Sequence, residues 1–314
     1  MPDSNIEAKR GISASAGWLE HGIPLLFVVI WATGFIIARM VAPHVAPLTF
    51  LSVRYLLSAG IFVLICLATG ATWPRTRTAW ANAALVGVLM QGAYLAGVFW
   101  SVRHGLPAGL AALIGGFQPL LTALLARPLL GEAVGRRRWM GVAMGFAGAA
   151  LVLLPGLGRP DGIPPVPLLV CCCGVMGLTF GTILQKRLPA GADLRANAAI
   201  QFIAAGIVTL PMAVLLEHPD FRFGVQDWVP EVWIGMAWAV LGLSVGAISL
   251  LLLMIRRGAV SAVASMFYLV PPTAALIAYA VFGERLIGIQ IAGMLLAAAG
   301  VALASRAAQA KRVG

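Results

Sequence analysis

The titratable residues of this chain avoid the positions that acid–base chemistry in a membrane would require. All eleven acids and all four histidines lie at the ends of apolar runs or between them. The chain has no HExxH or P-loop motif, and no acid pair lies inside an apolar run. A buried carboxylate, the usual proton relay of membrane proteins, is therefore also lacking. These observations disfavour an integral-membrane enzyme, which is kept as an alternative only.

Candidate ligands for a small molecule are instead polar and aromatic residues inside the apolar runs. Arg54 is the cation within such a run, where its guanidinium could either anchor a helix by snorkelling or bind a substrate carboxylate. The neutral candidates are Trp31, Gln91, Tyr94, Gln118, Ser244 and Tyr268. Each of them alone is better explained as a hydrogen-bond partner between helices than as a ligand. Together they predict a neutral, aromatic cavity with amide groups, suited to a zwitterion or an amphipathic neutral solute.

The elements that carry these residues are long apolar runs. The chain is 61% hydrophobic and 11% charged, with a mean hydropathy of +0.94, whereas about 25% of a soluble domain is charged. Because a transmembrane helix needs about 20 apolar residues, we predict an all-α membrane protein. The predicted spans are 22–42, 47–69, 79–102, 107–126, 138–155, 166–185, 195–216, 232–255, 260–282 and 286–305. The four cysteines lie within these runs as small apolar residues, so we expect neither a metal, a disulfide nor a cofactor.

The cationic residues orient these ten spans. If the N-terminus is cytoplasmic, sixteen Lys and Arg residues lie on the cytoplasmic side and five on the other side. This asymmetry places both tails, 1–21 and 306–314, in the cytoplasm. It also explains the net charge of +11 without a nucleic acid, so the expected partners are the lipid bilayer and a small-molecule substrate. The sequence does not indicate an oligomeric state.

The second half of the chain repeats the first. Four residues of one half recur in the other at a constant offset of 152, and Trp80 matches Trp233 at an offset of 153. The four are Pro119, Glu132, Gly141 and Gly148, matched by Pro271, Glu284, Gly293 and Gly300. They predict two five-helix repeats, 22–155 and 166–305, joined by a linker over 156–165. Because five is odd, the repeats cross the membrane in opposite senses, as in transporters that alternate access to a midplane site.

Matched prolines interrupt the fourth and ninth predicted spans. Pro119 cannot donate to the carbonyl of Gly115, and Pro271 cannot donate to that of Phe267. In hydrocarbon, a freed carbonyl is tolerated only against protein or a water-filled cavity. For the matched pair we favour cavity lining or a hinge over a plain kink that a neighbouring helix rescues.

Two acids, Glu132 and Glu284, stand at the ends of the same two spans. An acid near a helix N-terminus stabilises the helix through its macrodipole and can accept backbone N–H bonds. We therefore expect both glutamates to cap the helices that follow them, with a gating role as the alternative.

This pattern resembles the EamA type of the drug/metabolite transporter superfamily. The resemblance rests on two inverted halves, a Pro-x12-Glu segment closing spans 4 and 9, and Gly-x6-Gly in spans 5 and 10. Arg54, early in span 2, also fits the family, whereas Gln201 stands at the matching position of the second half. The resemblance implies an inner-membrane exporter of amino acids or other small metabolites, with a cavity lined mainly by spans 1, 3, 4, 6, 8 and 9.

We therefore predict a transporter that exports small neutral or zwitterionic metabolites by alternating access. A lipid or lipid-linked-sugar flippase is the alternative, although it would need interior cations to meet phosphate and Arg54 stands alone. Without an interior carboxylate, proton exchange and facilitated diffusion are equally compatible with the sequence.

Overall fold

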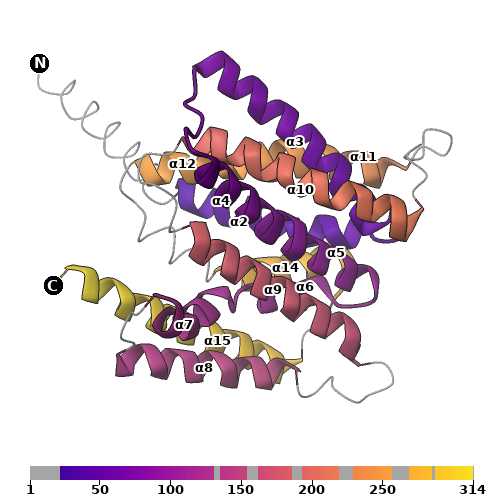
Figure 1. The fold of residues 1–314 in the computed structure, drawn as a ribbon. Coiled ribbons are helices and arrows are strands. Elements are labelled where there is room, and N and C mark those ends of the chain that lie inside the picture. Colours follow the sequence, from indigo (N-terminus) through magenta and orange to yellow (C-terminus); the bar gives the residue numbers. More distant parts are fainter. Residues whose placement is uncertain are drawn as a thin grey trace, which may run out of the picture.

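All elements that the structure describes are helices, as the sequence predicts (Figure 1). The computed structural model describes residues 22–130, 135–153, 162–185, 193–218, 229–256, 269–284 and 287–313. Its first-half elements are α2 (Ile23–Val41), α3 (Pro47–Thr69), α4 (Arg77–Gly87), η2 (Val88–Ala93), α5 (Tyr94–Arg103), α6 (Ala108–Gly115), α7 (Gln118–Leu130) and α8 (Arg136–Leu153). Its second-half elements are α9 (Pro165–Gln185), α10 (Leu194–Glu217), α11 (Pro230–Ala237), η4 (Trp238–Ala247), α12 (Ile248–Arg256), α14 (Val270–Phe282) and α15 (Gly288–Val313).

Six helical stretches are long and apolar enough to cross a membrane. They are Ile23–Val41, Pro47–Thr69, Arg77–Arg103, Pro165–Gln185, Leu194–Glu217 and Pro230–Leu250. Shorter apolar helices coincide with the other four predicted spans: Ala108–Thr122, Trp139–Val152, Val270–Phe282 and Gly288–Gly300. The all-α class is confirmed, and the count of ten spans stays a prediction.

Large apolar side chains cover the outside of these helices. Leu64 and Leu67 on α3 are 65% and 70% exposed, and Ile207 and Leu215 on α10 are 67% and 72% exposed. Water would penalise such a surface, whereas hydrocarbon would solvate it. The aromatic core lies inside, where Phe27, Phe50, Tyr55, Phe62 and Phe202 are fully buried.

The fourth predicted span is broken rather than continuous. α6 ends at Gly115 and α7 begins at Gln118, so Pro119 is the second residue of α7. Pro271 is likewise the second residue of α14. Proline is tolerated at these places because the first N–H groups of a helix have no partner within it. Both helices contain 13 residues and lie 152 positions apart, in agreement with the repeat.

Two π-helical turns interrupt the third and eighth predicted spans at related positions. η2 separates α4 from α5, and η4 separates α11 from α12. Shifting η2 by the offset of 153 places it within η4. Each π turn inserts a residue into a helix and re-aims the side chains around it, a feature frequent at functional sites.

The last helix runs further than predicted. α15 continues through the predicted tail 306–314 as far as Val313. The sequence of this extension, RAAQAKRV, consists mostly of strong helix formers, which explains why the helix does not stop at the expected boundary.

Matched helices of the two halves pack side by side in opposite directions. In the pair α3 and α10, Ser52 bonds to Thr209, and the start of α3 meets Glu217 at the end of α10. The pair α8 and α15 is also antiparallel (Figure 1), with Gly148 near Gly293. In the pair α6 and α14, contacts run from Gly109 with Ala275 to Gly116 with Pro271, and these helices are antiparallel as well.

Candidate functional site

A cavity of about 200 Å³ lies between the two halves of the chain. Its first-half wall comes from α2, α3, η2 and α5, and its second-half wall comes from α9, α10, η4 and α12. The lining residues are Trp31, Gly34, Phe35, Arg54, Met90, Gln91, Tyr94, Leu95, Val98, Phe99, Leu178, Gln185, Leu194, Asn197, Ala198, Gln201, Phe202, Leu243, Ser244 and Ile248. Both π turns therefore face this cavity.

The structure brings together five of the seven predicted substrate-binding residues. Trp31, Arg54, Gln91, Tyr94 and Ser244 all line the cavity. These residues come from five different elements, so only the packing of the helices brings them together.

The other predicted residues are not among those that the structure places at the cavity. Gln118 is not among the lining residues, and its side-chain amide donates to the Thr122 hydroxyl at 3.2 Å on the same helix. Tyr268 and Phe267 lie outside the described residues. Pro119 and Pro271 are not among the described lining residues.

Gly115 packs directly behind the cavity wall. A Cβ at this position would lie 3.1 Å from the Tyr94 hydroxyl and 3.3 Å from the ring of Phe35. A Cβ on the next residue, Gly116, would lie 2.7 Å from the ring of Pro271. The break between α6 and α7 thus fits between the cavity wall and the start of α14, where larger side chains would clash.

The charged end of Arg54 meets a hydroxyl in the wall. The side chain is only 5% exposed, and its Nη2 lies 3.4 Å from the Oγ of Ser244. Among the described residues, the buried Nε of Arg54 has no hydrogen-bond partner. The guanidinium is therefore held at the cavity, and most of its five N–H groups have no acceptor among the described residues.

Ser244 also stands in a Gly-Leu-Ser-Val-Gly segment, which has the spacing of a hydrolase nucleophile elbow. Such an elbow needs a sharp strand-to-helix turn that exposes the serine. Here Ser244 lies within the helical element η4, is 1% exposed, and donates to the carbonyl of Ala239 at 3.0 Å. The local structure is that of a helix-bound hydroxyl rather than of a nucleophile.

Aromatic rings form part of the first-half wall, and a buried tyrosine lies behind it. The ring of Trp31 packs against Phe27 at a centroid distance of 5.4 Å. Tyr55, fully buried behind the wall, donates its hydroxyl to the carbonyl of Gln91 at 2.5 Å. Because Gln91 lies in η2, this bond satisfies a backbone carbonyl within the π turn.

Sequence reasoning missed part of the second-half wall. Asn197 and Gln201 lie one turn apart on α10, and both line the cavity. The signal was available, because two amides spaced by four residues stand on one face of an otherwise apolar helix. Gln201 was recognised as the counterpart of Arg54 but was not proposed as a ligand.

Carboxylates of the second half cap helices of the first half at one end of the bundle. Glu217 accepts from the backbone N–H groups of Leu48 and Thr49 at 2.9 and 2.8 Å, at the start of α3. Glu284 accepts from Ala108 and Gly109 at 3.2 and 3.3 Å, at the start of α6. We call this region, comprising the starts of α3 and α6 with Glu217 and Glu284, the capped end.

The prediction for Glu284 was right about capping and wrong about the helix. Its carboxylate caps α6 rather than the following α15, because antiparallel packing brings the end of α14 to the start of α6. Arg39 adds an ion pair to this carboxylate at 3.8 Å. The other predicted cap, Glu132, lies outside the described residues.

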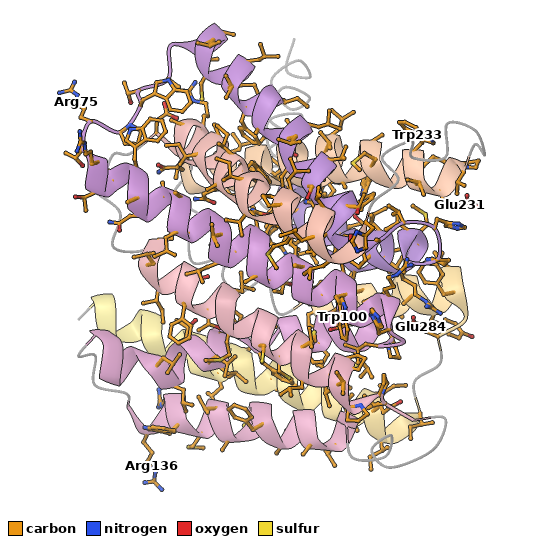
Figure 2. All side chains as sticks on the ribbon, turned by 45° about the vertical axis from the view of Figure 1, so that its right-hand side comes forward. Arg75, Trp100, Arg136, Glu231, Trp233 and Glu284 are labelled. Atoms are coloured by element: carbon orange, nitrogen blue, oxygen red, sulfur yellow. The ribbon has the colours of Figure 1, made fainter. Side chains whose placement is uncertain are left out.

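The cavity extends away from the capped end. Figure 2 shows Glu231 and Glu284 at one end of the bundle, and Arg75 and Arg136 at the opposite end. We call the latter the arginine end. Gln185, the last residue of α9, and Leu194, the first residue of α10, line the cavity and lead toward the arginine end. The lining of the cavity thus reaches helix ends on the side of the arginine end.

Comparison with known proteins agrees with this arrangement. The chain is 25% identical over 260 residues to the uncharacterized inner membrane transporter YedA of Escherichia coli, covering 82% of this chain and 81% of the relative. It is 25% identical to a probable amino-acid metabolite efflux pump of Salmonella typhimurium, with 89% and 92% covered. It is 28% identical to a probable terminal-alkyne amino-acid exporter of Streptantibioticus cattleyicolor, with 92% and 94% covered.

A solved crystal structure shares the fold. It superposes with a TM-score of 0.63 over 93% of this chain and 97% of its own, at 20% sequence identity. Residues 22–154 and 166–306 match the EamA-like transporter family, which is most of the sequence. The chain therefore belongs to the EamA-like transporter family.

Proposed function

We propose that this protein is a multi-pass inner-membrane transporter that exports small neutral or zwitterionic metabolites, amino acids among them, by alternating access. The observation that carries the proposal is the cavity between the two family-matched segments, to which both contribute lining residues. An aromatic cavity of this size with a few polar groups suits a small metabolite. The relatives named for export of amino-acid metabolites and of a terminal-alkyne amino acid support this substrate class.

The proposal includes ten spans arranged as two inverted repeats, 22–155 and 166–305. The antiparallel helix pairs support it, because a two-fold axis in the membrane plane would pair each helix with its own counterpart in this way. Contacts between α8 and α15 show the symmetry that such an axis requires. Gly148 lies close to Gly293, and their counterparts in the other half, Gly300 and Gly141, also lie close to each other.

Alternating access gives the two ends of the bundle distinct roles. With the arginine end in the cytoplasm and both tails on that side, the cavity leads toward the cytoplasm and the capped end seals the opposite side. Each capping interaction contributes about 0.5–2 kcal/mol. A seal built from a few such contacts is small enough for a two-state transition to break.

The direct test is solute flux in liposomes that contain the purified protein. We expect labelled amino acids or related metabolites to exchange faster than in empty liposomes. The substitution Ala198→Trp would fill the cavity, because Ala198 lines it, and should reduce the flux strongly. The matched control Ala68→Trp lies on an exposed face of α3 and should leave the flux unchanged.

Two results would overturn the proposal. One is flux no faster than in empty liposomes for all twenty amino acids and common aromatic metabolites. The other is flux that Ala198→Trp and Ala68→Trp reduce equally, since solute would then not pass through the cavity. The same assay with and without an imposed pH gradient separates proton exchange from facilitated diffusion.

A further inference from the structure

Arg54 places a positive charge in a wall that offers it little compensation. Arg54 is only 5% exposed, and its hydrogen bond to Ser244 is long at 3.4 Å. Its Nε is buried without a partner among the described residues. Removing an ion from water costs several kcal/mol unless charges and hydrogen bonds replace the solvent.

The described surroundings contain no counter-charge for this guanidinium. None of the described lining residues is acidic. The salt bridges found in the described ranges join Arg39 to Glu284 and Arg195 to Asp193, and neither reaches Arg54. Elsewhere in the chain, every acid lies outside the ten predicted spans. A ligand in the cavity is therefore the group best placed to neutralise Arg54.

We propose that the cavity prefers, among small metabolites, those that carry a carboxylate on an apolar body, and that Arg54 binds this carboxylate. This inference rests on the proposed function, because it assumes that the cavity holds the transported solute. A guanidinium presents parallel N–H donors that match the two oxygens of a carboxylate. The Ser244 hydroxyl accepts from Nη2 and donates to the carbonyl of Ala239, so it holds the guanidinium at the cavity.

The remaining wall accommodates the body of such a ligand. Trp31, Phe35 and Phe202 supply aromatic surface, which favours an aromatic or branched apolar group. Asn197 and Gln201 supply neutral amides that can accept from an ammonium group without neutralising it. An amino acid can therefore bind, but its ammonium adds a second positive charge beside Arg54.

Charge alone then predicts an order of affinity among ligands of one shape. A carboxylate without an ammonium leaves the cavity neutral, so 3-phenylpropanoate should bind more tightly than phenylalanine. Phenylalanine should bind more tightly than the cation phenylalaninamide. The uncharged 3-phenylpropanamide, which keeps the shape of 3-phenylpropanoate, should bind weakly because it leaves Arg54 uncompensated.

The test is calorimetric titration of the purified full chain with 3-phenylpropanoate and 3-phenylpropanamide near neutral pH. We expect the acid to bind about tenfold more tightly or better, the difference that charge-assisted hydrogen bonds provide. Arg54→Gln should remove the preference, and Arg54→Lys should retain part of it. Arg75→Gln, the same substitution at an exposed position of the arginine end, should leave it intact.

Equal affinity of the unmodified protein for the acid and the amide would overturn the inference, whether or not the Arg54 variants fold. A preference that survives Arg54→Gln would overturn it too, because another group would then bind the carboxylate. Neither result touches the proposed function if labelled solutes still cross liposomes and Ala198→Trp still blocks them. Conversely, selective binding without any flux would contradict transport and leave the carboxylate site in place.

Discussion

Arg54 and Asp193 are charged residues in opposite situations. Arg54 is buried at the cavity with one long hydrogen bond, whereas Asp193 caps the start of α10 at the edge of the bundle. Both carboxylate oxygens of Asp193 accept from Arg195, at 3.0 Å from Nε and 2.7 Å from Nη2. A satisfied charge of this kind stabilises an element, and an unsatisfied one is available to a ligand.

Asp193 allows a prediction for the pH dependence of stability. Its side-chain hydrogen bond with Arg195, above the other causes, lowers the pKa of Asp193 to about 2. Because this pKa is below the unfolded value, the stabilisation is complete above about pH 4 and is lost as the pH falls toward 2. Asp193→Asn should lower the melting temperature equally at about pH 5 and about pH 8, with a smaller difference only in acid. Thermal unfolding across this range checks it, and a difference that shrinks between those two values would contradict it.

The sequence identified five of the cavity residues for a simple physical reason. A polar or aromatic side chain in an apolar span either bonds to another helix or faces a cavity, so Arg54, Gln91 and Ser244 stood out by type alone. Gln118 stood out equally but bonds to Thr122 on its own helix. Which alternative applies depends on the rotation of each helix, and that is set by packing between helices distant in the sequence.

Between neighbouring helices, glycine contacts fix the distance at which the two helices pack. A Cβ on Gly148 would lie 2.4 Å from the backbone nitrogen of Ala297 and 2.5 Å from the carbonyl oxygen of Gly293. Backbone atoms cannot yield as a flexible side chain can, so α8 and α15 would have to move apart. This contact explains the matched glycines of spans 5 and 10 better than helix propensity does.

Gly148→Ala should therefore destabilise the protein by about 1–3 kcal/mol, the usual cost of overpacking. Gly60→Ala is the matched control, because a Cβ on Gly60 of α3 meets nothing within 4 Å. That variant should be neutral or slightly stabilised, since alanine favours a helix. Thermal unfolding of both variants in the same detergent gives the comparison, and equal melting temperatures would refute the tight contact.

The capped end supplies a second prediction for the helices. Glu284→Ala removes the acceptor of the first N–H groups of α6 and the partner of Arg39. We expect the capped end to open more often, so that a cysteine at Ala198 reacts faster with an impermeant thiol reagent added on that side. Glu231→Ala removes an acid at the same end, from the first turn of α11, and should not change the rate. Equal rates in both variants would show that Glu284 does not hold the seal.

The helical elements were more predictable than their interruptions. Apolar runs placed α3, α9 and α10 within a residue or two of their observed bounds. The prolines indicated a break near Pro119, but its position at residues 116–117 depends on packing against Pro271. The π turns left no mark in the sequence, because any run of apolar residues can accommodate the inserted residue.

At the scale of the whole molecule, two halves of one chain enclose the cavity between them. Three pairs of matched helices, α3 with α10, α6 with α14 and α8 with α15, pack antiparallel. Halves related by an inverted repeat can exchange conformations at similar energy, which is the physical basis of the proposed alternating access. The repeat could be read from the sequence because its prolines and glycines occupy structural positions that tolerate few other residues.

The most direct measurement is the sidedness of the starts of two matched helices, one in each half. Single cysteines at Arg77 and Glu231, near the starts of α4 and α11, would be placed in a chain whose four native cysteines are replaced. An impermeant maleimide is then applied to intact and permeabilised cells. Inverted repeats predict that the cysteine at position 231 reacts in intact cells and that the one at position 77 reacts only after permeabilisation. Reaction of both cysteines from the same side would contradict the inverted arrangement on which the proposed transport mechanism depends.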